Sequence, residues 1–260
     1  SSERKLLDIA VIRLPRISNF TDFNPFERYE NVSLRYVEKV SDLQKPDMIL
    51  IPGTKSTISD LKWLRQSGLE AAILKAAASG TLVFGICGGY QMLGRTVSDP
   101  DQVEAAGVRK IAGMDLLPMD TVFHGEKVQT QTSGTFSDIE GMLASLNGIH
   151  YEGYEIHMGR TELAEGAEAS ELSVPADRIL EEPVIQSGNV YGSYIHGIFD
   201  SQACGQAVVS SLLAAKGMDE SAIEAVDMHA YKEAQYDKLA DAVRSSLDMD
   251  LIYRILNREV

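Results

Sequence analysis

The chain has 260 residues, 44% of them hydrophobic, which is enough apolar material for one large core or one domain with a modest appendage. Its formal net charge of −14 repels phosphate backbones and anionic lipid surfaces, so we expect neither nucleic acid nor a membrane as a partner. Two cysteines are too few for a disulfide framework and no apolar run is long enough to span a membrane, so we expect a cytoplasmic protein.

Three apolar segments predict the first strands of a sheet, over residues 7–14, 32–40 and 47–51. The first segment follows almost directly on a start that lacks Met, so we expect the chain to derive from a longer polypeptide. Residues 16–26 between the first two strands mix turn formers with three aromatic side chains. We expect these aromatics to pack under the sheet rather than to contact a partner, because loops usually pack on their own domain.

The segment after the third strand, residues 52–57, superficially suggests a phosphate-binding loop. A Walker A loop needs glycine directly before the lysine and again five residues earlier, and here those places hold Thr54 and Ile49. We therefore predict a strand-to-helix turn that presents backbone amides at the carboxyl edge of the sheet, where open α/β sheets bind ligands. Ser56 or Thr57 is expected to cap the helical region that follows.

The most informative stretch comes next, where an apolar strand over residues 82–86 leads into a cysteine and two glycines. Gly88 and Gly89 permit a tight turn, and a helix from Tyr90 onward directs its free N–H groups at the Cys87 sulfur and favours the thiolate. An isolated cysteine is more often a small core residue, but this context indicates an exposed nucleophile. Alternation of strand and helix predicts a doubly wound, mostly parallel sheet.

The second half of the chain predicts further strands and then helices. Residues 121–136 and 151–160 read as antiparallel strands added to the parallel core, and residues 163–177 as an exposed excursion. A hairpin about Gly188 and Asn189 is predicted to end at His196. Three amphipathic helices, over residues 203–215, 230–247 and 251–256, are expected to use their apolar stripes as packing faces. We predict a single domain over 1–260, with an α/β core to about residue 200 and a C-terminal helical extension over 201–260.

A cysteine nucleophile needs a base, and histidine has a suitable pKa near neutrality. His157 and His196 each end an alternating strand before a glycine, so the residues alone leave both as candidates, with His196 favoured. The other histidines are weaker candidates: His150 beside a glycine loop, and His124 and His229 in segments without strand-end character.

The pattern Gly85-x-Cys87-x-Gly89-x-Gln91 resembles the nucleophile elbow of class I glutamine amidotransferases. Residues 12–23, 153–161 and 192–199 resemble the glutaminase domains of the cobyric acid synthase family, and the likeness continues into the tail over residues 238–249. This resemblance covers nearly the whole chain. It implies a flavodoxin-like α/β fold of the class I glutaminase type.

The resemblance also implies roles for single residues. Cys87 corresponds to the nucleophile and His196 to the catalytic base, while the backbone N–H groups of Gly53 and Gly88 would form the oxyanion hole. Gln91 resembles the residue that holds the bound glutamine. His157 is a weaker candidate for the α-carboxylate or amino group of glutamine, and a structural role for it is an equal alternative.

One position departs from the wider class, because Ile198 stands where most class I glutaminases have a glutamate that orients the histidine. Asp200, Glu155 or a carboxylate on another domain are candidates to replace it, and a bare Cys–His dyad is the remaining alternative. With the triad incomplete at its usual position, we expect weak activity from the isolated chain and completion or activation by a synthetase domain.

The family resemblance further implies what the ammonia is for. It would amidate side-chain carboxylates of a corrinoid in cobalamin biosynthesis, in a synthetase domain that uses ATP and Mg²⁺ and is absent from this chain. We expect no cofactor and no metal in the chain itself. The alternatives are a glutaminase for cobyrinic acid a,c-diamide synthesis or for a cell-wall lipid precursor, a non-catalytic docking subunit on the same fold, or a cysteine hydrolase acting on peptides or small carbonyls.

Overall fold

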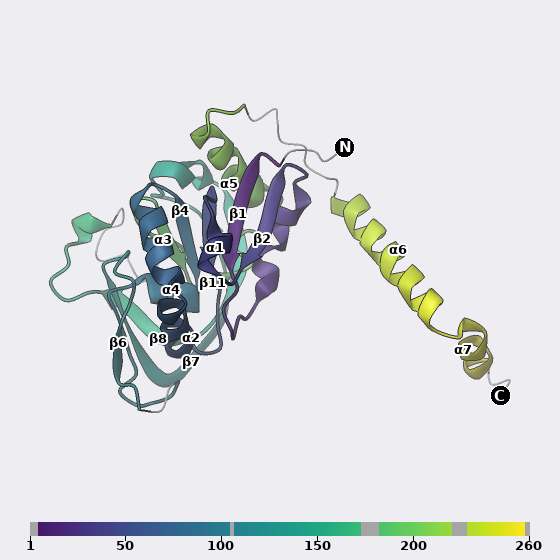
Figure 1. Ribbon diagram of the computed structural model, residues 1–260, viewed down its shortest axis with the longest axis horizontal. Helices are drawn as coiled ribbons and strands as arrows, with labels where there is room; N and C mark the ends of the chain where they lie inside the picture. The colour runs from purple at the N-terminus through teal and green to yellow at the C-terminus, as the bar shows by residue number, and fades with distance from the viewer. Residues whose placement is uncertain (1–4, 105–106, 173–181, 220–227, 258–260) are drawn as a thin grey trace.

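A six-stranded sheet forms the centre of the computed structural model, which describes residues 5–104, 107–172, 182–219 and 228–257 (Figure 1). All neighbouring strands in this sheet run parallel except the last pair, which confirms the predicted doubly wound, mostly parallel architecture. The strands lie in the order β2 (Val32–Val37), β1 (Leu7–Ile12), β3 (Met48–Ile51), β4 (Leu82–Ile86), β10 (Val190–Ser193) and β9 (Ile185–Ser187).

Both faces of this sheet are covered, because alternate residues of each strand enter different apolar clusters. In β1, Ile9 and Val11 pack on one side, with two 3-10 helices and α5. Ala10 and Ile12 pack on the other side, with α2, α3 and α4. The helices are η1 (Phe20–Arg28), α1 (Val40–Leu43), α2 (Thr57–Gln66), α3 (Leu69–Ala78), α4 (Gly88–Leu93), η2 (Gly141–Leu146) and α5 (Gln202–Ala215).

The aromatic loop after β1 folds as η1 and lies against the sheet. Phe23 and Phe26 are fully buried in the core, as the sequence predicts, whereas Phe20 stays 59% exposed. This packing holds the intervening segment in place. It also carries Asp22, a charged residue only 4% exposed, into the interior.

The antiparallel strands do not extend the parallel sheet as expected but form a second, five-stranded sheet. Its long strands pair antiparallel, with an irregularity between Val122 and Lys127. One residue, Tyr194, separates β10 in the first sheet from β11 in the second, so the chain changes sheets just before His196. The order is β11 (Ile195–His196), β8 (His150–Leu163), β7 (Met119–Thr135), β5 (Thr96–Ser98) and β6 (Lys110–Ala112).

The C-terminal helices divide into two groups. The apolar stripe of α5 is buried in the core, which confirms the expected packing face. The helices α6 (Met228–Ser246) and α7 (Met249–Leu256) extend away from the two sheets (Figure 1). The expectation that their apolar stripes pack within the chain is wrong. Tyr236, Leu239 and Leu256, for example, are 60%, 62% and 70% exposed. The excursion expected over residues 163–177 contains η3 (Ala169–Glu171), and its last residues lie outside the described part. Across the described residues, no helix is both long and apolar enough to cross a bilayer.

The close approach of α4 to β3 provides a test of the fold around Cys87. A methyl group added at Gly89 would overlap the carbonyl oxygen of Ile51, whereas one at Gly125 meets nothing within 4 Å. We expect Gly89→Ala to lower the free energy of unfolding by about 1–3 kcal/mol, the usual cost of overpacking. Gly125→Ala serves as the control and should stay within about 0.5 kcal/mol of the wild type. Urea denaturation measures both, and equal stability of the two variants would contradict the predicted overlap.

Candidate active site

Cys87 occupies a strained elbow between β4 and α4. Its backbone angles are φ 52° and ψ −110°, a conformation that costs a non-glycine residue on the order of 1–3 kcal/mol. Glycines on both sides let the chain pass: a Cβ at Gly85 would meet the Gly89 backbone at 2.7 Å, and one at Gly88 would meet Thr54 at the same distance. The predicted turn is therefore confirmed. The expectation of an exposed nucleophile is wrong, because Cys87 is buried and only 7% exposed.

His196 is fixed by a buried carboxylate. Its Nδ1 lies 2.7 Å from Oδ2 of Asp22, and the other carboxylate oxygen accepts the Gly197 N–H at 3.0 Å. The side chains of His196 and Asp22 are 1% and 4% exposed. A carboxylate only accepts hydrogen bonds, so the proton belongs on Nδ1 and the Nε2 atom remains for a second partner. Asn19 places its side-chain amide nitrogen 3.1 Å from that Nε2.

The Cys87 side chain also forms a hydrogen bond with the imidazole. A methyl group built on Gly53 would lie 3.0 Å from Cε1 of His196 and 3.6 Å from Cβ of Cys87, so both residues border the same point. Burial is the largest single influence on the His196 pKa and lowers it. Hydrogen bonds and charges from Asp22 and Cys87 together outweigh burial and raise the pKa of His196 from 6.5 to about 9. The arrangement therefore favours an imidazolium beside the Cys87 sulfur.

Asp22 completes a Cys–His–Asp triad, a role that the sequence analysis did not assign to it. The two in-chain candidates named there lie elsewhere: Glu155 contacts His157, and Oδ2 of Asp200 lies near the Gly197 backbone. Because this chain supplies the carboxylate, neither of the other two alternatives, a carboxylate on another domain or a bare Cys–His dyad, is needed. The available signal was an acidic residue directly before Phe23, in a segment whose aromatic side chains were expected to pack under the sheet.

A cavity of about 460 Å³ lies in front of Cys87, and most of the other predicted site residues line it. Gln91 lines it but is itself buried and held within the chain: its Oε1 accepts from the Thr57 hydroxyl at 2.9 Å, and its Nε2 donates to the Met158 carbonyl at 2.9 Å. Gly88 also lines this cavity, and Gly53 lies beside Cys87. The roles of Gln91, Gly53 and Gly88 toward glutamine stay predictions.

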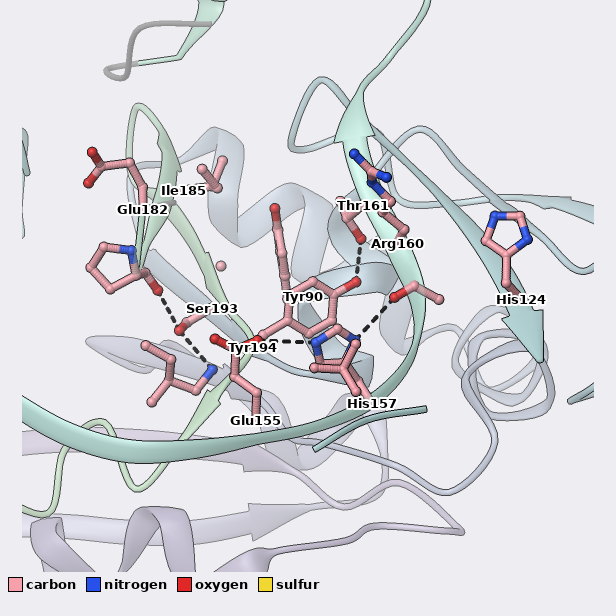
Figure 2. Close-up of a pocket in the computed structure, with 15 residues that line it drawn as sticks. Tyr90, His124, Glu155, His157, Arg160, Thr161, Glu182, Ile185, Ser193 and Tyr194 are labelled. Carbon is pink, nitrogen blue, oxygen red and sulfur yellow. Dashed lines mark hydrogen bonds and ion pairs between the residues drawn. The ribbon is translucent and has the colours of Figure 1, made fainter. Parts of the chain in front are cut away.

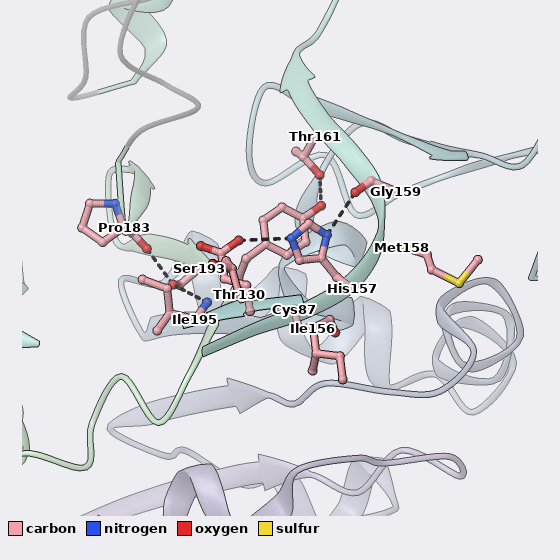
Figure 3. A network of polar contacts seen from close by, with 12 residues as sticks. Cys87, Thr130, Ile156, His157, Met158, Gly159, Thr161, Pro183, Ser193 and Ile195 are labelled. Atoms are coloured by element: carbon pink, nitrogen blue, oxygen red, sulfur yellow. Dashed lines mark hydrogen bonds and ion pairs between the residues drawn. The ribbon is translucent and has the colours of Figure 1, made fainter. Parts of the chain in front are cut away.

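His157 lies between this cavity and a larger one of about 580 Å³ that does not include Cys87 (Figure 2). Its ring stacks on Tyr194 with centroids 3.7 Å apart. Its Nε2 lies 3.2 Å from the Glu155 carboxylate (Figure 2), and its Nδ1 lies 3.1 Å from the Gly159 carbonyl (Figure 3). Both ring nitrogens thus have partners in the chain, which supports the structural alternative for His157.

The remaining histidines and the second cysteine are not placed at this site. His124 and His150 are exposed, and the side chain of His229 lies outside the described residues. Cys204 is fully buried in the core, and burial raises the pKa of its thiol. Within the described residues, no group of three or more potential metal-binding side chains comes together.

The turn after β3 ends in a different helix cap from the one predicted. Ser56 occupies the N-cap position of α2 but makes no capping hydrogen bond with its side chain. Instead the carboxylate of Glu104 accepts the backbone N–H groups of Thr57 and Ile58. Glu104 comes from the segment after β5, so a local reading of the turn could not identify it.

Comparison with known proteins agrees with the class of enzyme that this fold and triad define. The family of CobB/CobQ-like glutamine amidotransferase domains matches residues 8–204, and the chain belongs to it. Membership makes the chain a glutamine-hydrolysing enzyme domain.

Individual relatives extend this match along the chain. Cobyric acid synthase of Lachnoclostridium phytofermentans is 53% identical over 98% of this chain and 51% of its own length. Cobyric acid synthase of Ruminiclostridium cellulolyticum is 48% identical over 98% of this chain and 50% of its own length. The chain therefore spans about half the length of these relatives. Among solved structures, a glutamine amidotransferase of Thermotoga maritima has a TM-score of 0.47 at 14% identity, over 83% of this chain and 87% of that one.

The assignment of Asp22 is tested by replacement. Asp22→Asn keeps the size of the side chain but removes its charge, so the imidazolium loses its counter-ion and its preferred tautomer. We expect kcat for glutamine hydrolysis to fall about 10²- to 10⁴-fold, the range of general acid–base catalysis. Asp200→Asn is the matched control and should retain wild-type kcat. Loss of kcat in Asp200→Asn, with wild-type kcat in Asp22→Asn, would instead assign the orientation of His196 to Asp200.

The raised pKa of His196 predicts the alkaline limb of the pH profile. A histidine that serves as general acid loses its proton as pH rises through its pKa, here about 9, so kcat/KM should fall there. In Asp22→Asn, which lacks the carboxylate charge, the alkaline limb of the kcat/KM profile should move to lower pH. The folded pKa lies above 6.5, so this site also stabilises the fold fully below pH 6.5 and loses that contribution through about pH 9. A limb unmoved in Asp22→Asn would contradict this assignment.

Proposed function

We propose that this domain hydrolyses L-glutamine through a thioester on Cys87. The thiolate attacks the side-chain amide carbon, and the resulting oxyanion is stabilised by the backbone N–H groups of Gly53 and Gly88. His196 then gives its proton to the amide nitrogen, the carbon–nitrogen bond breaks and ammonia leaves. Water, deprotonated by His196, attacks the thioester and releases glutamate with the free thiolate.

The observation that carries this proposal is the buried Asp22–His196 pair beside Cys87 at the edge of a cavity. A nucleophile, a base and a residue that orients the base are the three parts that covalent amide hydrolysis requires. The backbone supports the proposed oxyanion hole, because Gly88 is the first residue of α4 and its N–H has no acceptor within the helix. Because the triad lies within the chain, we expect measurable hydrolysis without any partner.

The proposed use of the ammonia is supported by relatives that bear the name cobyric acid synthase and are about twice as long as this chain. We propose that the ammonia passes to an ATP- and Mg²⁺-dependent synthetase part and amidates side-chain carboxylates of a corrinoid. A partner that raises the rate further would act by positioning the site, since the carboxylate of the triad is already present.

Selective labelling tests the nucleophile. An electrophilic analogue of glutamine should modify Cys87 and spare Cys204, because Cys204 is fully buried and its raised pKa keeps the thiol protonated. Peptide mass spectrometry locates the adduct, and ammonia release from glutamine is measured on the same samples. Cys87→Ala should abolish both signals, while the matched Cys204→Ala variant keeps both.

Two outcomes would contradict the proposal. Ammonia release that survives Cys87→Ala would place the nucleophile elsewhere. Failure of the wild type to be labelled or to release ammonia, with or without a synthetase part, would favour the non-catalytic docking subunit.

A further inference from the structure

The cavity in front of Cys87 carries charges of both signs on its wall. Lys55, Glu104 and Lys127 line it together with the nucleophile, so residues of both charge signs border the same space. Glutamine has a matching distribution of charge. Its neutral amide must reach the sulfur, and its other end is a zwitterion with an α-ammonium and an α-carboxylate. This inference rests on the proposed function and concerns how that zwitterion is recognised.

Glu104 is held in place from two sides. Its carboxylate accepts the N–H groups of Thr57 and Ile58 at 2.5 Å and 2.8 Å. Behind it, the fully buried carboxylate of Asp99 accepts the N–H groups of Val103 and of Glu104 itself, at 2.8 Å and 3.0 Å. The acid is therefore preorganised at the cavity wall before any ligand arrives, and binding a ligand would cost little ordering of this side chain.

The carboxylate of Glu104 still has capacity for a cation. A carboxylate offers about four lone-pair sites; the two backbone N–H groups use two of them and the Thr57 side chain a third, which leaves one. Burial, the largest influence, raises the pKa of Glu104, because the surroundings destabilise its charge. The charged group that acts on it within the described residues is Asp99, a like charge that raises the pKa of Glu104 further. An ammonium group from a ligand would compensate for the charge of Glu104.

We propose that Glu104 binds the α-ammonium of L-glutamine, while Lys55 and Lys127 attract the α-carboxylate. The cavity thereby selects an α-amino acid over a simple amide of the same length. Glu104 is a specificity-determining residue in this assignment, because it contacts the end of the substrate that does not react.

The test compares L-glutamine with glutaramate, which keeps the amide and the carboxylate but lacks the α-amino group. In the full 260-residue chain, Glu104→Gln should lower kcat/KM for glutamine about 10- to 100-fold, mainly through KM, as loss of a charge-assisted hydrogen bond does. With glutaramate the same variant should stay within about twofold of the wild type. The preference for glutamine would therefore largely disappear.

Two further variants separate recognition from structure. Lys127→Gln should lower kcat/KM for both substrates by a similar factor, because both substrates carry the carboxylate. Glu38→Gln, which removes an exposed carboxylate paired with Arg13, should leave both unchanged. If Glu104→Gln lowers kcat/KM equally for both substrates, Glu104 acts only as the cap of α2 and the assignment is overturned. A wild type that does not prefer glutamine would overturn it as well.

A measurement without turnover keeps this assignment apart from the proposed reaction. Calorimetric binding of glutamine and glutaramate to Cys87→Ala, with and without Glu104→Gln, gives the same comparison. Loss of the preference in the double variant supports the ammonium site even where hydrolysis is not observed. Equal binding of the two ligands to Cys87→Ala overturns the ammonium site, whatever the outcome for the thioester.

Discussion

The hydrogen bond between Asp22 and His196 is the interaction on which the rest of the site depends. It joins the helical loop after β1 to the point where the chain passes from the parallel sheet to the second sheet. It fixes the imidazole tautomer, and with Cys87 it supplies the charge that keeps the ring protonated despite burial. Without Asp22, the ring would be a buried base with no charged group to orient it, and burial would favour its neutral form.

The parallel sheet places the other half of the reaction opposite this pair. β3, β4 and β10 are neighbours, and their carboxyl ends lead to Gly53, to Cys87 and, by way of Tyr194, to His196. The strained backbone of Cys87 is held there by close packing of the elbow glycines on the β3 turn. A fold whose strands are buried on both faces is rigid enough to support that strain and to keep the sulfur near the imidazole.

The sequence predicted the features that local patterns encode. The apolar run before Cys87 and the glycines after it specify the elbow, because strand periodicity and turn chemistry act over a few residues. His196 needed the family resemblance, since spacing alone left His157 as an alternative. Asp22 could not be assigned from spacing, because its contact with His196 spans 174 residues and depends on the packing of an aromatic loop.

Other differences have the same origin. Alternating strands indicate one buried face but do not say which sheet they join, so the second sheet was interpreted as part of the first. Amphipathic helices likewise indicate an apolar face without identifying what covers it, which is why α5 matched the expectation while α6 and α7 did not. The cap of α2 was missed because Glu104 lies 47 residues beyond the N–H of Thr57 that it accepts.

One chain supplies a complete triad in which the histidine carries charge at neutral pH. This charge can be measured by NMR titration of the imidazole ring of His196, assigned through a His196→Asn variant. We expect an imidazolium that persists to about pH 9 in the wild type and titrates at lower pH once Asp22 is replaced by Asn. Titration of the wild-type ring near its ordinary value of 6.5, unchanged by that replacement, would contradict it.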